Sequence, residues 1–440
     1  MARIALIVFV VVTTSGCATY VDHLNKATRS ASAGSYEEAL AEMNSVLGVE
    51  SGDELPNQWG GDRPLVVLER GSLQQALGRY RGASSDLSAA EAQLELLDLK
   101  TDPIGTLGSY LYSDSVRTYL TPPTERLSLN AINLLNFLAV GDLDGAAVEA
   151  RRFQVMREYL ASKDIHADGP ATLGTYLAGF VFEHTGEGDR ALRYYDEALA
   201  GGRIESLDGP IARLARSNPY RGSRLSEVLA RNPVAKADAA PDSELLVVLS
   251  VGRVPRREPA RIPVGAAVGL AGTYVSGDVN FLKYGATKVV VYPELVSTPS
   301  ALGAATVEVD GAVVRVDELT DLGAAIRKEY DEMRPKILAA ALTRMAARAG
   351  IAEGVRAAGR QKDDVLGDIL SILFESALVA LDRPDTRSWT MLPERVLAAR
   401  VPVMPGAHSV AVSFGGSSAR TLLVEVPPSG YAAVVVTEPR

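Results

Sequence analysis

The first half of the chain repeats a pattern of apolar residues three or four positions apart, broken by short turns that contain glycine. This spacing places the apolar side chains on one face of an α-helix, so it predicts a series of helices. In four places an alanine follows a turn glycine by five residues: Gly34 to Ala39, Gly78 to Ala83, Gly141 to Ala146 and Gly186 to Ala191. Glycine relieves the backbone between two helices, and a small alanine lets the second helix approach the first. The pattern therefore predicts helical hairpins.

These hairpins resemble tetratricopeptide repeats, in which pairs of helices stack into an α-solenoid. Small residues at Ala27, Gly71 and Gly179, inside the first helix of their pairs, fit the resemblance. The turn glycines are 44, 63 and 45 residues apart, whereas a regular array has a period of about 34 residues. We therefore expect a degenerate α-solenoid of tetratricopeptide-like hairpins with long inserts over residues 17–238.

Near residue 238 the pattern changes from helical to extended, after a stretch rich in proline and arginine. Apolar runs of strand length follow at residues 245–251 and 288–292. Asp310-Gly311 is typical of a two-residue turn in a β-hairpin. We therefore expect strands of a sheet over residues 245–316.

Helical spacing returns over residues 318–381, where Pro335 and Gly350 predict breaks between helices. The last part of the chain, residues 396–437, holds four extended runs separated by proline and glycine, which is typical of antiparallel strands. Together these segments predict an α+β domain over residues 239–440. The expected fold class is thus an α+β multidomain protein.

An apolar run of different character, Ile4 to Val12, lies near the start of the chain and leads into Thr14-Ser15-Gly16-Cys17. The run is too short to span a bilayer as a helix, and it has the length of the apolar region of a secretory signal. A cysteine after small residues resembles the end of a bacterial lipoprotein signal peptide, here residues 1–16. The resemblance implies acylation of the Cys17 thiol, and Ala18 in place of aspartate implies the outer membrane, facing the periplasm. A simple cleaved signal with an incidental cysteine is the alternative.

Composition narrows the chemistry that the protein can perform. Cys17 is the only cysteine among 440 residues, so its acylation leaves no thiol for a disulfide, a nucleophile or a metal site. The chain is 47% apolar, enough for two or three cores, and its net charge of −9 argues against a nucleic-acid partner. The four histidines are isolated, and the sequence holds no metal-ligand, nucleophile-elbow or nucleotide-binding motif. We therefore expect no cofactor, and a binding protein rather than an enzyme.

Two further segments carry a resemblance of their own. Residues 119–152 contain Tyr-Leu-Thr-Pro-Pro-Thr-Glu-Arg-Leu and Val-Glu-Ala-Arg-Arg, and residues 385–406 contain Asp-Thr-Arg-Ser-Trp and Ala-Arg-Val-Pro. Both are similar to segments of a family of bacterial lipoproteins that join helical repeats to a β-containing C-terminal domain. That family has no established activity to carry over. Some of its members are encoded near lipoproteins that activate peptidoglycan synthases, which implies the peptidoglycan synthesis machinery as one class of partner.

The same two segments supply the candidate partner-binding residues. These are Tyr119, Glu125, Arg126, Glu149, Arg151, Arg152, Arg387 and Trp389. Guanidinium groups present planar, paired donors that match a carboxylate of a peptide or protein partner. In the alternative interpretation the charged residues form a structural ion-pair network and Trp389 anchors the core.

A separate cluster of four arginines lies in a proline-containing stretch at positions 253, 256, 257 and 261. Its cations would contact lipid phosphates if the stretch lies at the membrane. A solvated loop without a ligand is the other interpretation of the same residues.

We therefore expect a lipid-anchored periplasmic scaffold that presents a concave helical surface to an envelope protein partner. The N-terminal lipid holds it at the membrane. Two alternatives stay open. One is a peptidoglycan- or glycan-binding protein, with or without hydrolytic activity, built around Arg387 and Trp389; the other is a purely structural envelope lipoprotein.

Overall fold

The computed structural model describes residues 20–96, 119–165, 167–231, 243–274, 289–298, 300, 302–360, 384–415 and 419–440. Cys17 and the predicted signal peptide lie outside the described residues, as does the part of the predicted helical segment beyond residue 360. The described chain is an α+β protein, with helices in its first half and most of its strands in the second. None of its described helices is both long enough and apolar enough to cross a membrane.

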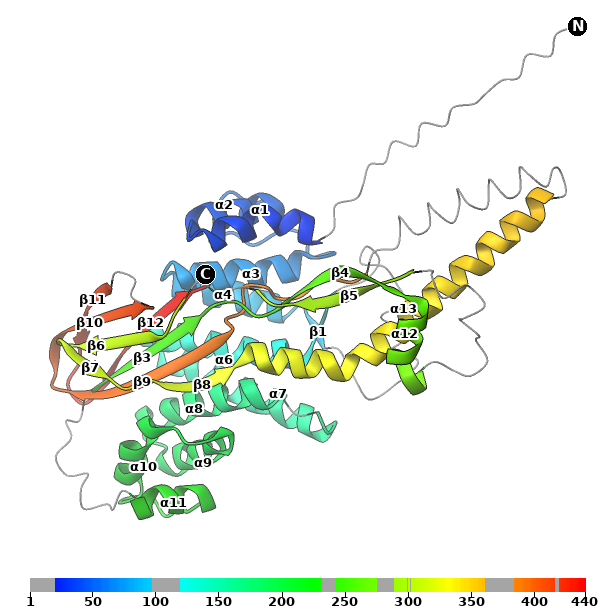
Figure 1. Ribbon diagram of the computed structural model, residues 1–440. Coiled ribbons are helices and arrows are strands. Elements are labelled where there is room, and N and C mark those ends of the chain that lie inside the picture. Colours follow the sequence, from blue (N-terminus) through cyan, green and yellow to red (C-terminus); the bar gives the residue numbers. More distant parts are fainter. Residues whose placement is uncertain are drawn as a thin grey trace, which may run out of the picture.

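The helices of the first half form hairpins in chain order, and each hairpin packs on the next (Figure 1). The pairs are α1 (Tyr20–Ser32) with α2 (Tyr36–Leu47), α3 (Arg63–Ala76) with α4 (Tyr80–Glu91), α6 (Pro123–Ala139) with α7 (Leu143–Ser162), and α8 (Asp168–His184) with α9 (Gly188–Ala198). The short elements η1 (Leu199–Gly201), η2 (Glu205–Leu207), α10 (Asp208–Leu214) and α11 (Ser223–Arg231) follow. Two-residue strands β1 (Glu95–Leu96) and β2 (Leu120–Thr121) lie between α4 and α6.

Each of these hairpins turns at a glycine that the sequence predicts. The φ angles at Gly34, Gly78, Gly141 and Gly186 are +81°, +73°, +72° and +81°. Residues with a Cβ rarely adopt this left-handed region. The alanines five positions later are fully buried: Ala39, Ala83, Ala146 and Ala191. The prediction of helical hairpins at these four places is confirmed.

Two sheets make up most of the described second half. The central sheet has the strand order β12-β3-β9-β8, and the outer sheet has the order β11-β10-β6-β7. The central strands are β3 (Ser243–Val251), β8 (Asp317–Asp321), β9 (Arg395–Val403) and β12 (Tyr431–Glu438). The outer strands are β6 (Ala305–Val309), β7 (Ala312–Val314), β10 (Gly406–Phe414) and β11 (Arg420–Val426). The predicted turn joins β6 to β7, with φ of +52° at Asp310 and +81° at Gly311.

The last strand departs from the predicted antiparallel arrangement. β12 pairs in parallel with β3, from Tyr431 opposite Glu244 to Glu438 opposite Val251. Residues 432–436 are all apolar, so both faces of this strand need burial. The central sheet is covered on both faces, whereas the outer sheet leaves residues such as Leu423 exposed. Burial therefore places β12 in the central sheet.

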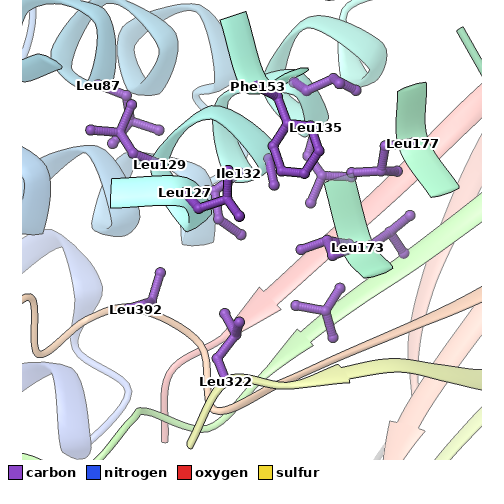
Figure 2. Packing of buried hydrophobic residues seen from close by; sticks show 14 of the residues in the cluster. Leu87, Leu127, Leu129, Ile132, Leu135, Phe153, Leu173, Leu177, Leu322 and Leu392 are labelled. Atoms are coloured by element: carbon purple, nitrogen blue, oxygen red, sulfur yellow. The ribbon is translucent and has the colours of Figure 1, made fainter. Parts of the chain in front are cut away.

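The central sheet lies between the helices and the outer sheet, so the described protein has three layers (Figure 1). On β3, Leu246 belongs to the core that the helices form, and its neighbour Leu245 belongs to the core between the sheets. Figure 2 shows Leu322 and Leu392, from the second half of the chain, beside the helical cluster that includes Leu173. The helical and β-containing parts thus share one hydrophobic core.

A third group of elements, which we name the arm, extends from the sheet layers. It consists of β4 (Arg256–Pro263), α12 (Val264–Ala271), η4 (Gly272–Tyr274), β5 (Val289–Val296) and α13 (Leu322–Arg360). These elements have their own apolar cluster, and the apolar run predicted at residues 288–292 forms the start of β5.

Two predictions for α13 are wrong. The helix is continuous through Pro335 and Gly350, where the sequence predicts breaks. Residues 318–321, predicted as helix, instead belong to strand β8. Pro335 removes one backbone hydrogen bond. Tyr330 and Leu338, on either side of the proline, are buried in the apolar cluster of the arm. We attribute the continuity of the helix to this packing.

Candidate functional site

The segment that leads into β9, residues 385–392, is held in the interior. The indole of Trp389 is fully buried, and its Nε1 donates to Ser72 Oγ of α3 at 2.9 Å. The backbone N–H groups of Thr390 and Met391 donate to the Glu69 carboxylate at 2.7 and 2.6 Å. Trp389 therefore joins this segment to α3 and offers no aromatic face to a sugar or a partner.

Arg387 lies in the same segment and is also buried. Its Nε and Nη2 donate to the two carboxylate oxygens of Asp385 at 2.9 and 2.7 Å, and its Nη1 lies 3.2 Å from Asp62 Oδ1. The guanidinium carbon lies 5.9 Å from the centre of the Tyr119 ring. This arginine is thus committed to contacts inside the protein.

Tyr119 and Glu125 meet beside that arginine. Both side chains are buried, and the Tyr119 hydroxyl donates to the Glu125 carboxylate. Burial raises the pKa of Glu125 to about 7, against the opposing effects of the Tyr119 hydrogen bond and Arg257. The tertiary structure therefore brings together the predicted residues Tyr119, Glu125, Arg387 and Trp389, but in the interior rather than on a surface.

The other four predicted residues lie around an open groove, which we name the α7 groove. It has a volume of about 540 Å³ and is formed by the end of α4, by α6 and by α7. On its polar side, Arg126 Nη2 and Arg152 Nη1 lie 3.0 and 3.4 Å from Glu91. Glu149 is buried beside it, 3.0 Å from Arg152, and burial raises the pKa of its carboxyl.

The apolar side of the α7 groove is unusually exposed. Val148, Val155 and Tyr159 on α7 keep 44%, 66% and 42% of their surface accessible, and their spacing of seven and four residues places them on one helix face. Val148 and Val155 line the groove together with Arg151, which is exposed. Contiguous exposed apolar side chains bordered by polar groups are typical of interaction sites.

Two arginine groups in this groove have no acceptor in the described part of the chain. Arg126 Nη1 is buried without a hydrogen-bond partner, while the rest of that guanidinium pairs with Glu91. Among the described residues, Arg151 has no acceptor either. An unpaired buried donor is unfavourable by about 1–3 kcal/mol. Of the two groups, the exposed guanidinium of Arg151 is the one that a carboxylate or carbonyl oxygen of a partner can reach.

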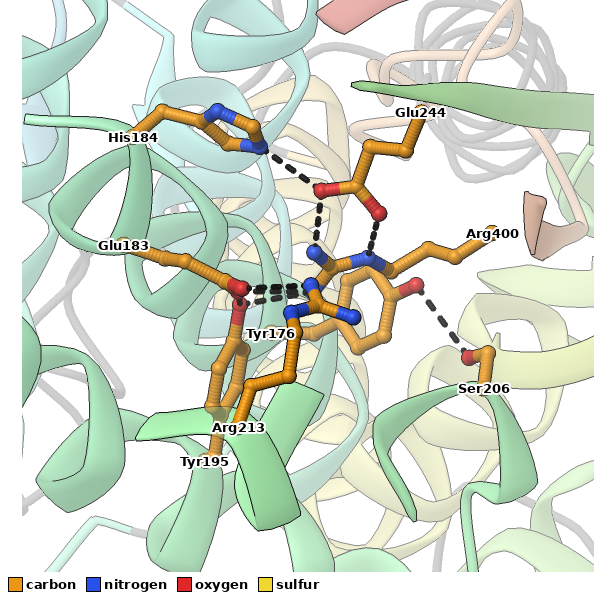
Figure 3. Close-up of polar contacts among 8 residues, drawn as sticks. All are labelled: Tyr176, Glu183, His184, Tyr195, Ser206, Arg213, Glu244 and Arg400. Atoms are coloured by element: carbon orange, nitrogen blue, oxygen red, sulfur yellow. Dashed lines mark hydrogen bonds and ion pairs between the residues drawn. The ribbon is translucent and has the colours of Figure 1, made fainter. Parts of the chain in front are cut away.

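A separate charged cluster joins the helices to the central sheet (Figure 3). Arg400 on β9 is buried and donates two hydrogen bonds to the Glu244 carboxylate on β3. One comes from its Nε at 2.9 Å and the other from its Nη2. Its Nη1 also donates to Glu183 of α8 at 3.0 Å and to the Tyr195 hydroxyl at 2.8 Å. His184 Nε2 lies 2.7 Å from Glu244 Oε1.

Electrostatics fix the charge states in this cluster. Burial by itself raises the pKa of the Glu244 carboxyl, but Arg400 and His184 hold that pKa well below its usual range. Burial lowers the pKa of Arg400, and Glu183 and Glu244 more than reverse that effect. All these charges are compensated inside the protein, so the cluster is a structural clamp between the two halves of the chain. The sequence offers no signal for it, because Glu244 and Arg400 are 156 residues apart.

The predicted arginine cluster is dispersed by the fold. Arg253 is buried and donates to Ser32 Oγ at 2.6 Å, and Arg257 is buried and donates to the Arg387 carbonyl at 3.2 Å. Arg256 pairs with Glu258 at 2.5 Å. Arg261 is exposed. The cluster therefore does not form a single cationic surface.

The described residues contain no group of three or more histidine, cysteine, aspartate and glutamate side chains arranged to hold a metal ion. Comparison with protein families, curated proteins and solved structures gives no match. The α7 groove is the candidate functional site, because exposed apolar side chains meet unsatisfied arginine donors there.

Proposed function

We propose that this protein is a lipid-anchored scaffold of the bacterial cell envelope, which binds an acidic, amphipathic segment of an envelope protein in its α7 groove. The helical hairpins with glycine turns and buried alanines support a degenerate tetratricopeptide-like repeat region. The Thr14-Ser15-Gly16-Cys17 sequence supports acylation of Cys17. The peptidoglycan synthesis machinery is the first class of partner to test, because the resemblance of two segments implies it.

The pairing of charge with exposed apolar surface in the α7 groove carries this proposal. Apolar side chains of a partner helix would cover Val148 and Val155, which keep 44% and 66% of their surface exposed. A partner carboxylate would accept from the exposed guanidinium of Arg151. This local excess of cations contrasts with the net charge of −9 for the whole chain, and it favours an acidic partner over a basic one.

The chain's own sheet occupies the other face of the helices. Strand β12 of the central sheet packs against α3 and α6, and β8 packs against α8. Nearly every residue of α3 and most residues of α6 and α8 are buried. The concave surface that the sequence suggests for a partner is therefore covered by the chain itself. Binding is instead proposed on the outer face, which α4 and α7 supply.

The lipid anchor would hold the scaffold and its partner in the same layer at the membrane. Tethering converts partner binding into an encounter within a thin layer at the membrane, where the effective concentration of both molecules is high. The glycan-binding alternative has less support, because Trp389 and Arg387, on which it depends, are buried.

In-cell photocrosslinking tests the proposal. A photoreactive amino acid replaces Val155 in the groove, and a matched probe replaces Leu423, which is 84% exposed on β11. We expect a discrete envelope protein to crosslink to position 155 and not to position 423. Arg151→Glu should reduce that crosslink about tenfold by charge repulsion, and the reversal Arg203→Glu at an exposed arginine elsewhere should not.

The Cys17→Ala variant separates binding from tethering. If the thiol is acylated, this variant leaves the membrane and the crosslink weakens although the groove is intact. Equal crosslinking at positions 155 and 423 would contradict the proposal, as would a single-chain product in which position 155 is linked to another peptide of the same chain. The single-chain product would mean that the groove is filled by the protein itself.

A further inference from the structure

Around helix α12 the arm presents a second exposed apolar surface, which we name the arm patch. Leu270, Tyr274 and Val289 keep 46%, 44% and 43% of their surface accessible, and Pro263 and Ala266 beside them are exposed. Ala266 and Leu270 are four positions apart on α12, so they share its outer face. The opposite face of α12 is buried in the apolar cluster of the arm.

Cations flank the arm patch. Arg261 is exposed on β4, two positions before Pro263, and Lys336 Nζ lies 5.7 Å from the centre of the Tyr274 ring. Two acidic residues of the β4–β5 hairpin lie away from the patch. Glu258 and Glu294 are opposite each other, and Glu258 is five residues before Pro263, which corresponds to about 16 Å along a strand. The arm patch and its neighbours therefore combine apolar side chains, an aromatic ring and positive charge. This composition is typical of a surface that lies in a membrane interface.

The proposed anchor places the same side of the molecule against the bilayer. The described fold begins at Tyr20, only three residues after Cys17, and three residues span at most about 11 Å. An acylated Cys17 would therefore hold the first turn of α1 close to the membrane surface. Figure 1 shows the arm, with α12, extending toward the side of the molecule where α1 begins.

We propose that the arm patch inserts Leu270 and Tyr274 into the interface of an anionic bilayer, while the exposed Arg261 contacts lipid phosphates. The orientation of the patch in the cell rests on the proposed lipid anchor. The affinity of the patch for lipid depends only on its own side chains. Together with the lipid, the patch would be a second membrane contact that fixes the orientation of the α7 groove.

Cys17 is the only cysteine of the chain, which makes a clean fluorescence experiment possible. The chain from residue 17 onward, which contains every described residue, is prepared with Cys17→Ala and with either Leu270→Cys or Leu423→Cys. Each new thiol carries an environment-sensitive fluorophore. The probes are vesicles of phosphatidylcholine, with and without phosphatidylglycerol. We expect a blue shift for the label at position 270 with the anionic vesicles, and little change for the label at position 423.

An unlabelled pair of variants controls for the fluorophore. Combined Leu270→Gln and Tyr274→Ser should reduce co-sedimentation with anionic vesicles at least tenfold, because two apolar side chains no longer insert. Leu423→Gln should leave it unchanged, and circular dichroism checks that both variants are folded. Equal responses at positions 270 and 423 would overturn the proposal, as would a shift at 270 that grows with protein concentration without vesicles. The latter result would identify a second copy of the chain as the occupant.

This test is independent of the groove proposal. Vesicle binding by an unacylated chain reports on the arm patch alone, whereas crosslinking at position 155 reports on the α7 groove. Failure of either experiment leaves the other result interpretable.

Discussion

At the scale of single residues, the main feature is buried charge that is satisfied by groups distant in the sequence. Glu69 on α3 accepts the backbone N–H groups of Thr390 and Met391, and Glu244 on β3 is paired with Arg400 and His184. The two cases differ in their electrostatics. Burial raises the pKa of Glu69 to about 7, whereas its partners hold the pKa of Glu244 low.

The raised pKa values predict how stability depends on pH. Glu69 and Glu125 both change from a usual pKa of 4.5 to about 7 in the folded protein. The folded state then binds more protons than the unfolded state between these values, so stability falls as pH rises from 4.5 to 7. Each group contributes a change of about 3 kcal/mol. Denaturation by urea at a series of pH values should show a smaller loss over this window for Glu125→Gln than for the wild type. Equal slopes for the two proteins would contradict this assignment.

The Arg400 clamp predicts a large and asymmetric effect of mutation. Arg400→Met leaves Glu244 and Glu183 buried without their shared cation, and we expect a loss of about 3–5 kcal/mol in the free energy of unfolding. Adding Glu244→Leu should recover part of this loss, because the double variant removes a buried charge. As a control, Arg79→Ala breaks an exposed pair with Glu37 and should change stability by about 1 kcal/mol or less. A double variant less stable than Arg400→Met would show that the charges contribute through something other than pairing.

At the scale of the elements, local sequence fixes the hairpins and tertiary packing fixes α13. The turn at Gly78 needs a left-handed backbone with φ of +73°, and glycine is the residue that supplies it. Helix α13 instead continues through a residue that usually ends a helix, because packing in the arm keeps Pro335 inside it. Turn chemistry is therefore a better guide to this protein than helix-breaking residues are.

A pair of glycine substitutions tests this distinction. No atom lies within 4 Å of a Cβ built on Gly78 or on Gly265, and only Gly78 has a positive φ. Gly78→Ala should therefore destabilise the protein by about 1 kcal/mol through backbone strain alone. Gly265→Ala, inside α12, should be neutral or stabilise the protein by up to about 1 kcal/mol, because alanine favours the helix. Thermal unfolding of the two variants measures the change in stability in each case. Equal destabilisation by the two substitutions would contradict backbone strain at Gly78 as the cause.

At the scale of the whole molecule, the central sheet makes the two parts interdependent. One face of β3 packs with the helices and the other with the outer sheet, so Leu246 and Leu245 belong to different cores. The helical part alone would expose the apolar surface that the sheet covers. Its outer face, with the α7 groove, and the arm patch are two of the exposed apolar surfaces of the described protein.

The shared core predicts one cooperative unit. The fragment of residues 17–238 alone should lack a sharp thermal transition and should aggregate, because the surface of α3, α6 and α8 that faces the sheet is apolar. Co-expression with the fragment of residues 239–440 should restore a soluble complex. The intact chain should unfold in a single calorimetric transition. A stable, monomeric 17–238 fragment would instead establish two independent domains.

The sequence by itself determined what depends on short-range chemistry. It located the hairpin turns at Gly34 and its equivalents, the turn at Asp310-Gly311 and most of the strands, because φ preferences and apolar periodicity act over a few residues. It also singled out Arg151 and Arg126, two residues that the fold places at the α7 groove.

Only the tertiary structure decided which of the singled-out residues are available to a partner. The sequence predicts Trp389 and Arg387 as candidates for binding, but both are buried. They contact Ser72 and Asp62, which lie more than 300 residues earlier in the chain. The parallel pairing of β12 with β3, and the burial of Arg400 beside Glu244, depend on contacts of the same long range. Burial is a property of the packed molecule, because a side chain becomes inaccessible only when distant segments cover it.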